Sequence, residues 1–315
     1  MAPRCIVIAG AHGFMGTRFA ELYRAEGDTV QTVGRRDADA VWGDAAAIAR
    51  LVDGADVLVN LAGKSVDCRY NDRNKAEIFR SRLETTAELG RAVAQVDAPP
   101  PVWLNASTAT IYRHADDGPQ TEADGELGHG FSVEVATSWE RMFFDAAREG
   151  VRQVAMRTAI TLGRGSALTP LAMLARFGLG GPQLGGPSNR GAGLHGGRQR
   201  FSWVHLDDVY RAMRFLETSD LDGPVNIASP NPSTNREVMA TIRRVLGVPV
   251  GIPLPRFALE LGALAMRTET ELILKSRWVL PKRLLDAGFE FAFPDLEGAL
   301  RDILRPEPAP ARSGG

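Results

Sequence analysis

Three glycines near the amino terminus have the spacing of a phosphate-binding turn. They lie in the stretch GAHGFMG, which follows a short apolar run and opens a helical pattern. The first glycine permits a tight turn, the second lets the backbone approach a pyrophosphate, and the third lets the helix pack closely. The start of the helix offers unpaired N–H groups and partial positive charge to phosphates. We therefore expect a dinucleotide here, in contact with Gly10, His12, Gly13, Phe14, Met15 and Gly16.

The end of the second apolar run predicts which dinucleotide binds. NAD sites place Asp or Glu at this point, for the ribose hydroxyls. Here Val33 and Gly34 are followed by Arg35 and Arg36, and no carboxylate comes before Asp37. Two guanidinium groups suit a 2′-phosphate, which they hold by forked, charge-assisted hydrogen bonds. The alternative is a solvated basic turn, and we predict NADP(H) in preference to NAD(H).

The elements that must position these residues alternate in type along the first half of the chain. Apolar runs predict strands at 5–9, 29–33, 57–60, 102–106 and 153–157, and amphipathic stretches predict helices at 14–26, 45–53, 74–96 and 133–148. This order indicates an α/β fold, a Rossmann-type doubly wound parallel sheet. Such sheets bind ligands at the carboxyl ends of their strands. Further cofactor contacts are therefore expected at Asp44, Leu61, Ala62, Gly63 and Arg157, although a structural hydrogen bond is an equal interpretation for Arg157.

The second half of the chain is less regular. We assign residues 1–165 to the NADP(H)-binding domain, with its sheet completed by parts of 198–230, and residues 166–305 to a smaller, mostly helical substrate-side region. A small C-terminal domain is expected from about residue 250, helices at 206–217 and 235–246, and a strand at 225–228. The glycine-rich stretch 178–197 is interpreted as a loop, either a lid or an inert insertion. The tail at 306–315 is expected to be disordered.

Composition limits the classes of function. The 315 residues are 44% hydrophobic and 24% charged, as in a globular protein with a sizeable core. A net charge of −1 gives no basic field for nucleic acid, and no apolar run has the length of about 20 residues that a membrane span needs. Two cysteines and five histidines, without metal-ligand spacing, predict no metal site. We expect a cytoplasmic protein with a small-molecule substrate and no nucleic-acid or membrane partner; a homodimer is one hypothesis for its assembly.

Several longer stretches carry a family resemblance. With its glycine turn, the NLAG at 60–63 and the STATIY at 107–112, the chain resembles the extended, epimerase-like short-chain dehydrogenases/reductases. It is most similar to an atypical branch labelled nucleoside-diphosphate-sugar epimerases, whose members end in a domain of unknown function. The stretches that carry this likeness are GKSVDCRYNDRNKAEIFRSRLETT (63–86), WE (139–140), RQRFSWVHLDD (198–208), GPVNIASP (223–230) and PKRLLDAGFEFAFP (281–294). They cover nearly the whole chain and are specific for the family, but not for a reaction.

The resemblance implies hydride transfer assisted by Ser or Thr, Tyr and Lys. Thr108 matches the hydroxyl that orients a substrate carbonyl. The Tyr-x-x-x-Lys element falls on Ser132 and Ala136, so the usual proton donor is absent. Candidates for its replacement are Ser132 and Tyr112, followed by Tyr70, Arg82, Glu134 and His205. Contacts with an anionic or phosphorylated substrate are expected from Arg69 and Arg82, and a contact with the substrate cleft from Gln199.

Three hypotheses follow for the function. In the first, another group supplies the proton. In the second, the reaction needs no strong acid, and Thr108 and Arg82 hold the substrate. In the third, the protein binds NADP(H) without turnover. We prefer NADP(H)-dependent oxidoreduction or epimerisation of a small polar substrate. The alternative is a non-catalytic redox sensor or interaction protein. At the start of the helix at 206–217, Asp207 and Asp208 are expected to form the cap, and His205 is interpreted as a hinge residue.

Overall fold

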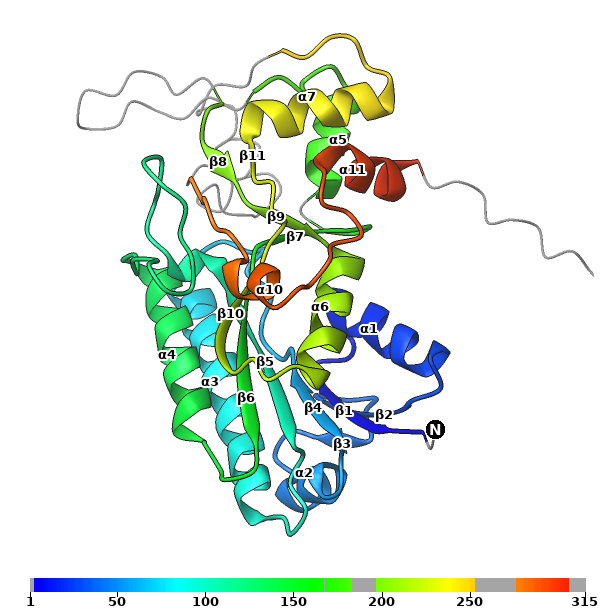
Figure 1. The fold of residues 1–315 in the computed structure, drawn as a ribbon, viewed down its shortest axis with the longest axis vertical. Helices are drawn as coiled ribbons and strands as arrows, with labels where there is room; N and C mark the ends of the chain where they lie inside the picture. The colour runs from blue at the N-terminus through cyan, green and yellow to red at the C-terminus, as the bar shows by residue number, and fades with distance from the viewer. Residues whose placement is uncertain (1–2, 167, 183–196, 253–275, 306–315) are drawn as a thin grey trace, which may run out of the picture.

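The computed structural model describes residues 3–166, 168–182, 197–252 and 276–305. Its centre is a seven-stranded sheet with the order β10-β6-β5-β4-β1-β2-β3, in which all neighbours run parallel (Figure 1). The strands are β1 (Cys5–Ala9), β2 (Thr29–Gly34), β3 (Ala40–Val41), β4 (Val57–Asn60), β5 (Val102–Thr108), β6 (Arg152–Thr158) and β10 (Gly223–Ile227). The predicted Rossmann-type fold is thus confirmed, and β10 brings a strand from the second half of the chain into the sheet.

Helices cover both faces of the sheet, because alternate residues of a strand point to opposite sides. Ile6 and Ile8 of β1 pack in the core cluster that includes α1 (Phe14–Ala25) and α6 (Leu206–Thr218). Val7 and Ala9 pack in a second cluster, with α2 (Ala45–Val52), α3 (Asp72–Gln95) and α4 (Phe131–Asp145). Figure 1 shows these two groups of helices on opposite sides of the sheet. Burial on both sides explains why β1 is a continuous apolar run.

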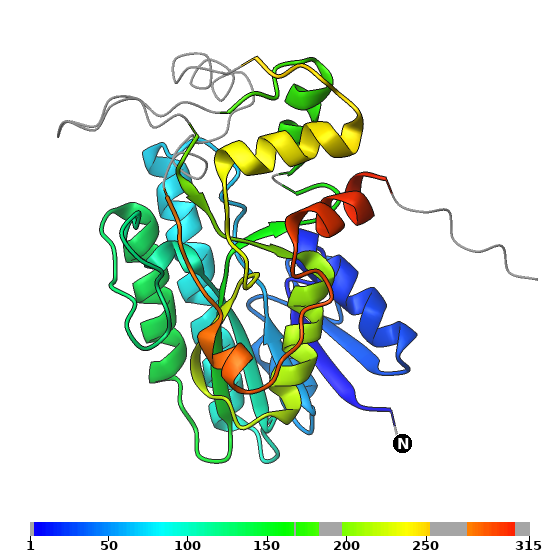
Figure 2. The ribbon, with the colours of Figure 1, turned by 45° about the horizontal axis from the view of Figure 1, so that its top comes forward.

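A smaller unit lies beyond the carboxyl ends of the strands (Figures 1 and 2). Helices α5 (Leu168–Arg176), α7 (Asn235–Leu246) and α11 (Leu296–Leu304) share one hydrophobic cluster. Two short strand pairs adjoin them, β7 (Ile160–Leu162) with β9 (Trp203–His205) and β8 (Arg200–Phe201) with β11 (Ser233–Thr234). The short helices η1 (Ala109–Ile111) and α10 (Lys282–Asp286) follow β5 and pack on β10, respectively.

The sequence patterns predict the long elements well and miss the short ones. The strands expected at 5–9 and 57–60 and the helix at 235–246 coincide with β1, β4 and α7. Helix α5 and the strands of two or three residues are not anticipated, because periodicity needs a longer segment to be recognised. Most of the glycine-rich stretch at 178–197, the region 253–275 and the tail at 306–315 lie outside the described residues.

The start of α6 corrects one expectation. The cap is His205, whose Nδ1 accepts a hydrogen bond from the backbone N–H of Asp207 at 3.1 Å. The Asp207 carboxylate pairs with Arg18 of α1 at 3.1 Å. The buried Asp208 carboxylate accepts hydrogen bonds of 2.8 and 2.9 Å from two consecutive backbone N–H groups at 292 and 293. Both carboxylates therefore join distant segments to the helix, a role that a local capping rule does not predict.

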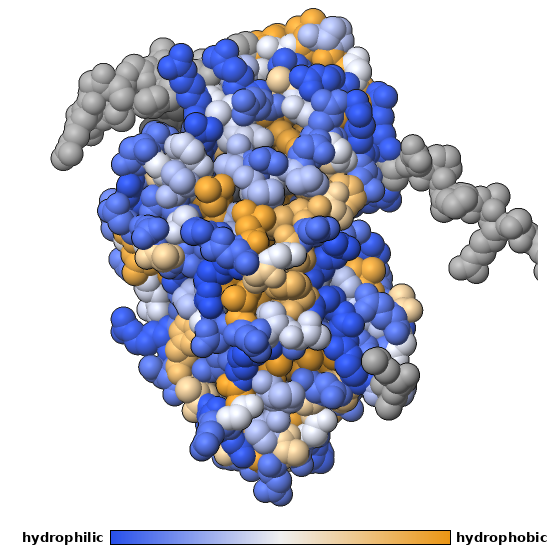
Figure 3. All heavy atoms as spheres, viewed as in Figure 1, coloured by the Kyte–Doolittle hydropathy of each residue, from blue (hydrophilic) through white to orange (hydrophobic). Residues whose placement is uncertain are grey.

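Two surface properties complete the description. Within the described ranges, no helix is long and apolar enough to cross a membrane. Figure 3 shows apolar residues gathered in the middle of the face seen in Figure 1, with hydrophilic residues around them. Leu284 of α10 and Phe289 are buried in the same cluster as α6, so the C-terminal segment is packed onto the sheet domain.

Candidate cofactor and substrate site

The glycine turn is shaped by close backbone contacts. Gly10 has φ +86°, and a Cβ there would lie 2.9 Å from backbone atoms of Leu61 and Ala62. At Gly16 a Cβ would lie 2.3 Å from the carbonyl oxygen of Gly10. Gly13 begins α1 without a side-chain cap, and the first turn has no acidic residue. Helix α4, which begins after Gly130, also has no side-chain cap, whereas α2, α3, α6, α7 and α11 each have one. The uncapped N–H groups of α1 are what a pyrophosphate requires.

The end of β2 presents two basic side chains next to this turn. Arg35 and Arg36 are exposed, and neither is in an ion pair with any residue that the structure describes. His12 lies beside them, since its Nδ1 would be 3.8 Å from a Cβ on the last residue of β2. The Asp39 carboxylate is used locally, accepting from the backbone N–H and hydroxyl of Thr32 at 2.8 and 2.7 Å. The charge left at this strand end is therefore positive.

A buried amide network fixes the ends of β4 and β5. Asn60 donates to Asn105 at 2.7 Å and to the hydroxyl of Thr86 at 3.0 Å, and all three residues are buried. The side-chain amide oxygen of Asn60 accepts a hydrogen bond from the backbone N–H of Ala62 at 3.1 Å. The Trp139 indole of α4 donates to the same threonine hydroxyl at 2.9 Å. Asn60 thus connects the loop that touches Gly10 to β5 and to Thr86 of α3, and Trp139 connects the same threonine to α4.

Arg82 of α3 lies directly against this loop. A Cβ at Gly63 would be 3.2 Å from the Arg82 Cζ atom. The guanidinium donates from Nη1 to the carbonyls of Lys64 and Ile78, both at 3.1 Å, and its Cζ lies 5.1 Å from the centre of the Trp139 ring. Burial lowers the pKa of Arg82 to about 10. This cation therefore borders the predicted cofactor loop in a partly dehydrated position.

Thr108 ends β5, which lies between β4 and β6 in the sheet. Its hydroxyl accepts a hydrogen bond from the Thr110 backbone N–H at 3.1 Å and lies 2.9 Å from the Thr110 hydroxyl. The side chain is only partly buried. A hydroxyl at a strand end can contact a ligand while a local turn fixes its rotamer. Its predicted contact with a substrate carbonyl stays a prediction.

Tyr112 and Arg157, predicted to contact ligands, form a buried polar cluster. Arg157 donates from Nε and Nη2 to the Glu140 carboxylate at 2.8 and 2.7 Å, and from Nη1 to the Tyr112 hydroxyl at 2.9 Å. That hydroxyl donates to Asn226 of β10 at 2.9 Å. Ser107 donates to Glu140 at 2.6 Å. Arg157 thus makes the structural hydrogen bonds that were weighed against cofactor binding, and its contact with a cofactor stays a prediction. Burial raises the pKa of Tyr112, which disfavours it as a proton donor.

The first turn of α4 is where a Tyr and a Lys are missing. The Ser132 hydroxyl is buried and has no hydrogen-bond partner in the described part of the chain. Ala136 is fully buried and packs with Ile111 and Tyr112. Among the described residues, no charged group is hydrogen-bonded to Ser132, and the ammonium of Lys75 lies 5.6 Å from the centre of the neighbouring Phe131 ring. Ser132 would therefore be an unassisted, weak proton donor.

The other predicted contacts are spread along the carboxyl edge and beyond. Asp44 caps α2, accepting from the Ala47 backbone N–H at 2.9 Å. Arg69 lies in the loop after β4, with its carbonyl bound by the Asn74 amide at 2.7 Å. Gln199 is buried on the segment that leads into β8. Phe14 is exposed beside Gly163, and Met15 packs against the core. Ligand contacts of these residues stay predictions.

Sequence reasoning did not assign a role to Glu140, Asn105 or Ser107. Each is buried and hydrogen-bonded at the carboxyl edge or in α4. A signal was present, because Asn60 and Asn105 are amides in otherwise apolar strands and face each other in the register of β4 and β5. A polar residue within a buried strand has to find a partner, which marks such positions for attention.

Comparison with known proteins assigns the family. A model described as the NAD dependent epimerase/dehydratase family matches residues 6–228, and a domain of unknown function, DUF1731, matches residues 254–303. The chain belongs to the NAD dependent epimerase/dehydratase family. The predicted resemblance to extended, epimerase-like dehydrogenases with a domain of unknown function at the C-terminal end is thereby confirmed.

Three relatives in this family show how much of the chain is shared. The epimerase family protein SDR39U1 of Bos taurus is 31% identical over 316 residues, which cover 95% of this chain and 99% of that protein. The structure of human SDR39U1 with NADPH superposes with a TM-score of 0.82 at 29% identity, covering 95% and 98% of the two chains. A nucleoside-diphosphate sugar epimerase from Corynebacterium glutamicum has a TM-score of 0.73 at 27% identity, covering 96% of this chain and 58% of that one.

Proposed function

We propose that this chain is an NADP(H)-dependent oxidoreductase or epimerase-like enzyme that acts on a small polar substrate. The observation that carries the proposal is the pairing of an uncapped α1 terminus with two exposed arginines at the end of β2. The backbone N–H groups at the start of α1 would hold the pyrophosphate, and the two arginines would hold the 2′-phosphate. The relative SDR39U1 was solved with NADPH, which supports the same choice for this chain.

The chain's own residues would orient the substrate more than they would exchange protons with it. NADPH, when bound, supplies the hydride. Thr108 would donate a hydrogen bond to the substrate carbonyl at the end of β5, and Arg82 would hold another part of the molecule. Tyr112 is engaged on both sides by Arg157 and Asn226, so we assign it to the wall of the site. The proton would come from solvent or from a weak donor such as Ser132.

The cofactor assignment is tested by binding measurements. We expect Arg35→Ala to weaken NADPH at least tenfold and to leave NADH unchanged, because only NADPH has the 2′-phosphate that a forked guanidinium can hold. Arg50→Ala, an exposed arginine of α2, is the matched control and should change neither affinity. Equal affinity of the wild type for both cofactors would contradict the choice of NADP(H).

Turnover is tested by following oxidation of NADPH with a panel of aldehydes, ketones and quinones. If a substrate is found, Thr108→Val should abolish turnover and leave NADPH affinity within twofold. Turnover that is unchanged in this variant would remove Thr108 from the mechanism. The homodimer hypothesis is checked on the same samples by sedimentation equilibrium.

The second candidate function is a non-catalytic NADP(H)-binding sensor or interaction protein. It is favoured by the start of α4, where Ser132 and the fully buried Ala136 occupy the positions at which the family resemblance implies tyrosine and lysine. Tight NADPH binding without hydride transfer to any member of the panel would select this alternative.

A further inference from the structure

The Arg82 guanidinium has one side engaged and the other open. Its Nη1 group donates to two backbone carbonyls, while Nε and Nη2 have no hydrogen-bond partner among the described residues. Those two nitrogens form the edge with which an arginine holds a carboxylate or phosphate by two parallel hydrogen bonds. The side chain keeps partial exposure, so this edge is accessible to a ligand.

The charge of Arg82 is not balanced by any carboxylate in the described part of the chain. Its electrostatic neighbours are Tyr70 and Cys68, a phenol and a thiol, which ordinarily carry no full charge near pH 7. The carboxylates on either side of Arg82 along the helix pair with other cations: Glu77 is 2.7 Å from the ammonium of Lys64, and Glu84 is 3.8 Å from the guanidinium of Arg80. A partly dehydrated cation without a counterion costs free energy, which a bound anion would offset.

The surroundings of Arg82 connect it to the predicted cofactor site. It touches Gly63, and the two residues before that glycine touch Gly10 of the phosphate-binding turn. On its other side it stacks on Trp139 of α4. The loop above it is fixed to the same helix, because the Tyr70 ring packs edge-on against Phe131 with 5.3 Å between ring centres. The Arg82 side chain therefore contacts both the predicted cofactor loop and α4.

We propose that Arg82 binds an oxoanion of the substrate, a carboxylate or a phosphate group, through its Nε–H and Nη2–H edge. The inference rests on the proposed function and narrows its substrate class to small anionic carbonyl compounds or their alcohols. Arg82 holds the anionic group and Thr108 holds the carbonyl. An arginine is required here because only a planar guanidinium stacks on the indole and still offers a fork.

The test is isothermal titration of the full chain, saturated with NADP⁺, with sodium oxalate and separately with inorganic phosphate. Saturation with NADP⁺ blocks the phosphate site expected at Arg35 and Arg36. We expect one of the two anions to bind at one site per chain with a Kd of about 1 mM. Arg82→Met should weaken that anion at least tenfold, and Arg82→Lys should not restore it. Arg80→Met, an exposed arginine on the same helix, is the matched control and should bind as the wild type.

The outcomes separate this inference from the proposed function. Preference for oxalate supports a carboxylate substrate, and preference for phosphate supports a phosphorylated one. The inference is overturned if neither anion saturates the wild type, or if Arg82→Met binds the anion with unchanged affinity. It is also overturned if Arg82→Met lowers the affinity for NADPH, because Arg82 would then be a contact of the cofactor. If the chain does not bind NADP⁺, the proposed function fails, and the same titration on the Arg35→Ala variant still reports on Arg82.

Discussion

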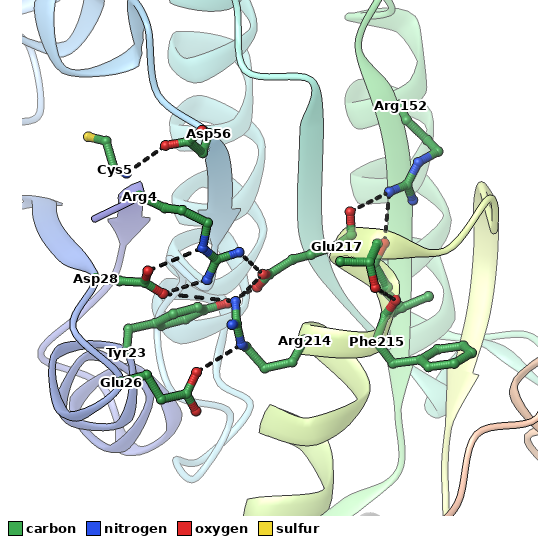
Figure 4. A network of polar contacts seen from close by, with 12 residues as sticks. Arg4, Cys5, Tyr23, Glu26, Asp28, Asp56, Arg152, Arg214, Phe215 and Glu217 are labelled. Carbon is green, nitrogen blue, oxygen red and sulfur yellow. Dashed lines mark hydrogen bonds and ion pairs between the residues drawn. The ribbon is translucent and has the colours of Figure 1, made fainter. Parts of the chain in front are cut away.

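Partly buried arginines occur at both edges of the sheet, and their partners differ. At the amino edge, Arg4 contacts the carboxylates of Asp28 and Glu217, and Arg214 contacts Glu217 and Glu26 (Figure 4). At the carboxyl edge, Arg82 has backbone carbonyls and an aromatic ring around it, and no carboxylate among the described residues. A cation that only stabilises the fold needs its counterion within the fold, whereas a cation that binds a ligand keeps a place for the ligand's charge.

Position at one edge or the other does not by itself explain this difference. Arg157 of β6 also lies towards the carboxyl edge, and Glu140 accepts two hydrogen bonds from it. Both side chains of that pair are about nine-tenths buried, with 10% and 9% of their surface exposed. The comparison therefore separates the three arginines that contact a carboxylate, which we regard as structural, from Arg82, which has none among the described residues.

The largest change in stability is expected when the buried pair of Arg157 and Glu140 is broken. Glu140→Ala should lower the free energy of unfolding by about 3–5 kcal/mol, because it leaves the Arg157 charge buried without a counterion. Chemical denaturation measures this. The double variant Glu140→Leu with Arg157→Met removes both charges and should recover much of the loss. A loss below about 1 kcal/mol for the single variant would show that this pair is not the structural element we describe.

A change of opposite sign is expected at Arg82. Arg82→Met removes a cation that burial disfavours, and should leave the free energy of unfolding unchanged or raise it by up to about 2 kcal/mol. The same denaturation experiment, in the absence of ligands, measures it. A clear loss of stability would place Arg82 with Arg157 among the structural arginines and remove the contrast.

The amino-edge network should show a smaller, pH-dependent effect at Glu217. Burial raises the pKa of this carboxyl, although hydrogen bonds from Tyr23 and Arg4 oppose the shift. The folded state therefore holds the proton more tightly than the unfolded state. Its contribution to stability is present below the ordinary glutamate pKa and is lost as pH rises through the raised value.

Glu217→Gln removes this titration and tests its sign. The stability of the wild type relative to the variant should fall as pH rises from about 4 towards neutrality. Denaturation curves of both proteins across that range measure the difference. A relative stability that rises with pH would mean that the two arginines outweigh burial at this carboxylate.

The smallest effect is expected where a pair is exposed. Arg80 and Glu84 of α3 are 3.8 Å apart, and each side chain is 68% exposed. Solvent screening leaves such a pair with little net energy, so Arg80→Ala should not change the midpoint of unfolding measurably. A clear shift of the unfolding midpoint would mean that an exposed arginine pair can stabilise the fold as a buried pair does.

Features that depend on neighbours along the chain could be predicted from the sequence. The glycine spacing, the apolar runs of β1 and β4, and the extent of α7 are local, and each is found where it was predicted. The basic pair at Arg35 and Arg36 could also be identified, because its position follows from the end of one strand. Local steric and hydrogen-bonding rules are enough for these elements.

Which charged residues pair with one another is settled by the three-dimensional arrangement of the chain. Arg4 and Glu217 are separated by 213 positions and Arg18 and Asp207 by 189, and no pattern along the chain indicates these pairs. Nor could it distinguish Arg157, which has a carboxylate, from Arg82, which has an aromatic ring and an open edge. The physical reason is that a guanidinium's state depends on what surrounds it in space, and strands and helices from across the chain supply those surroundings.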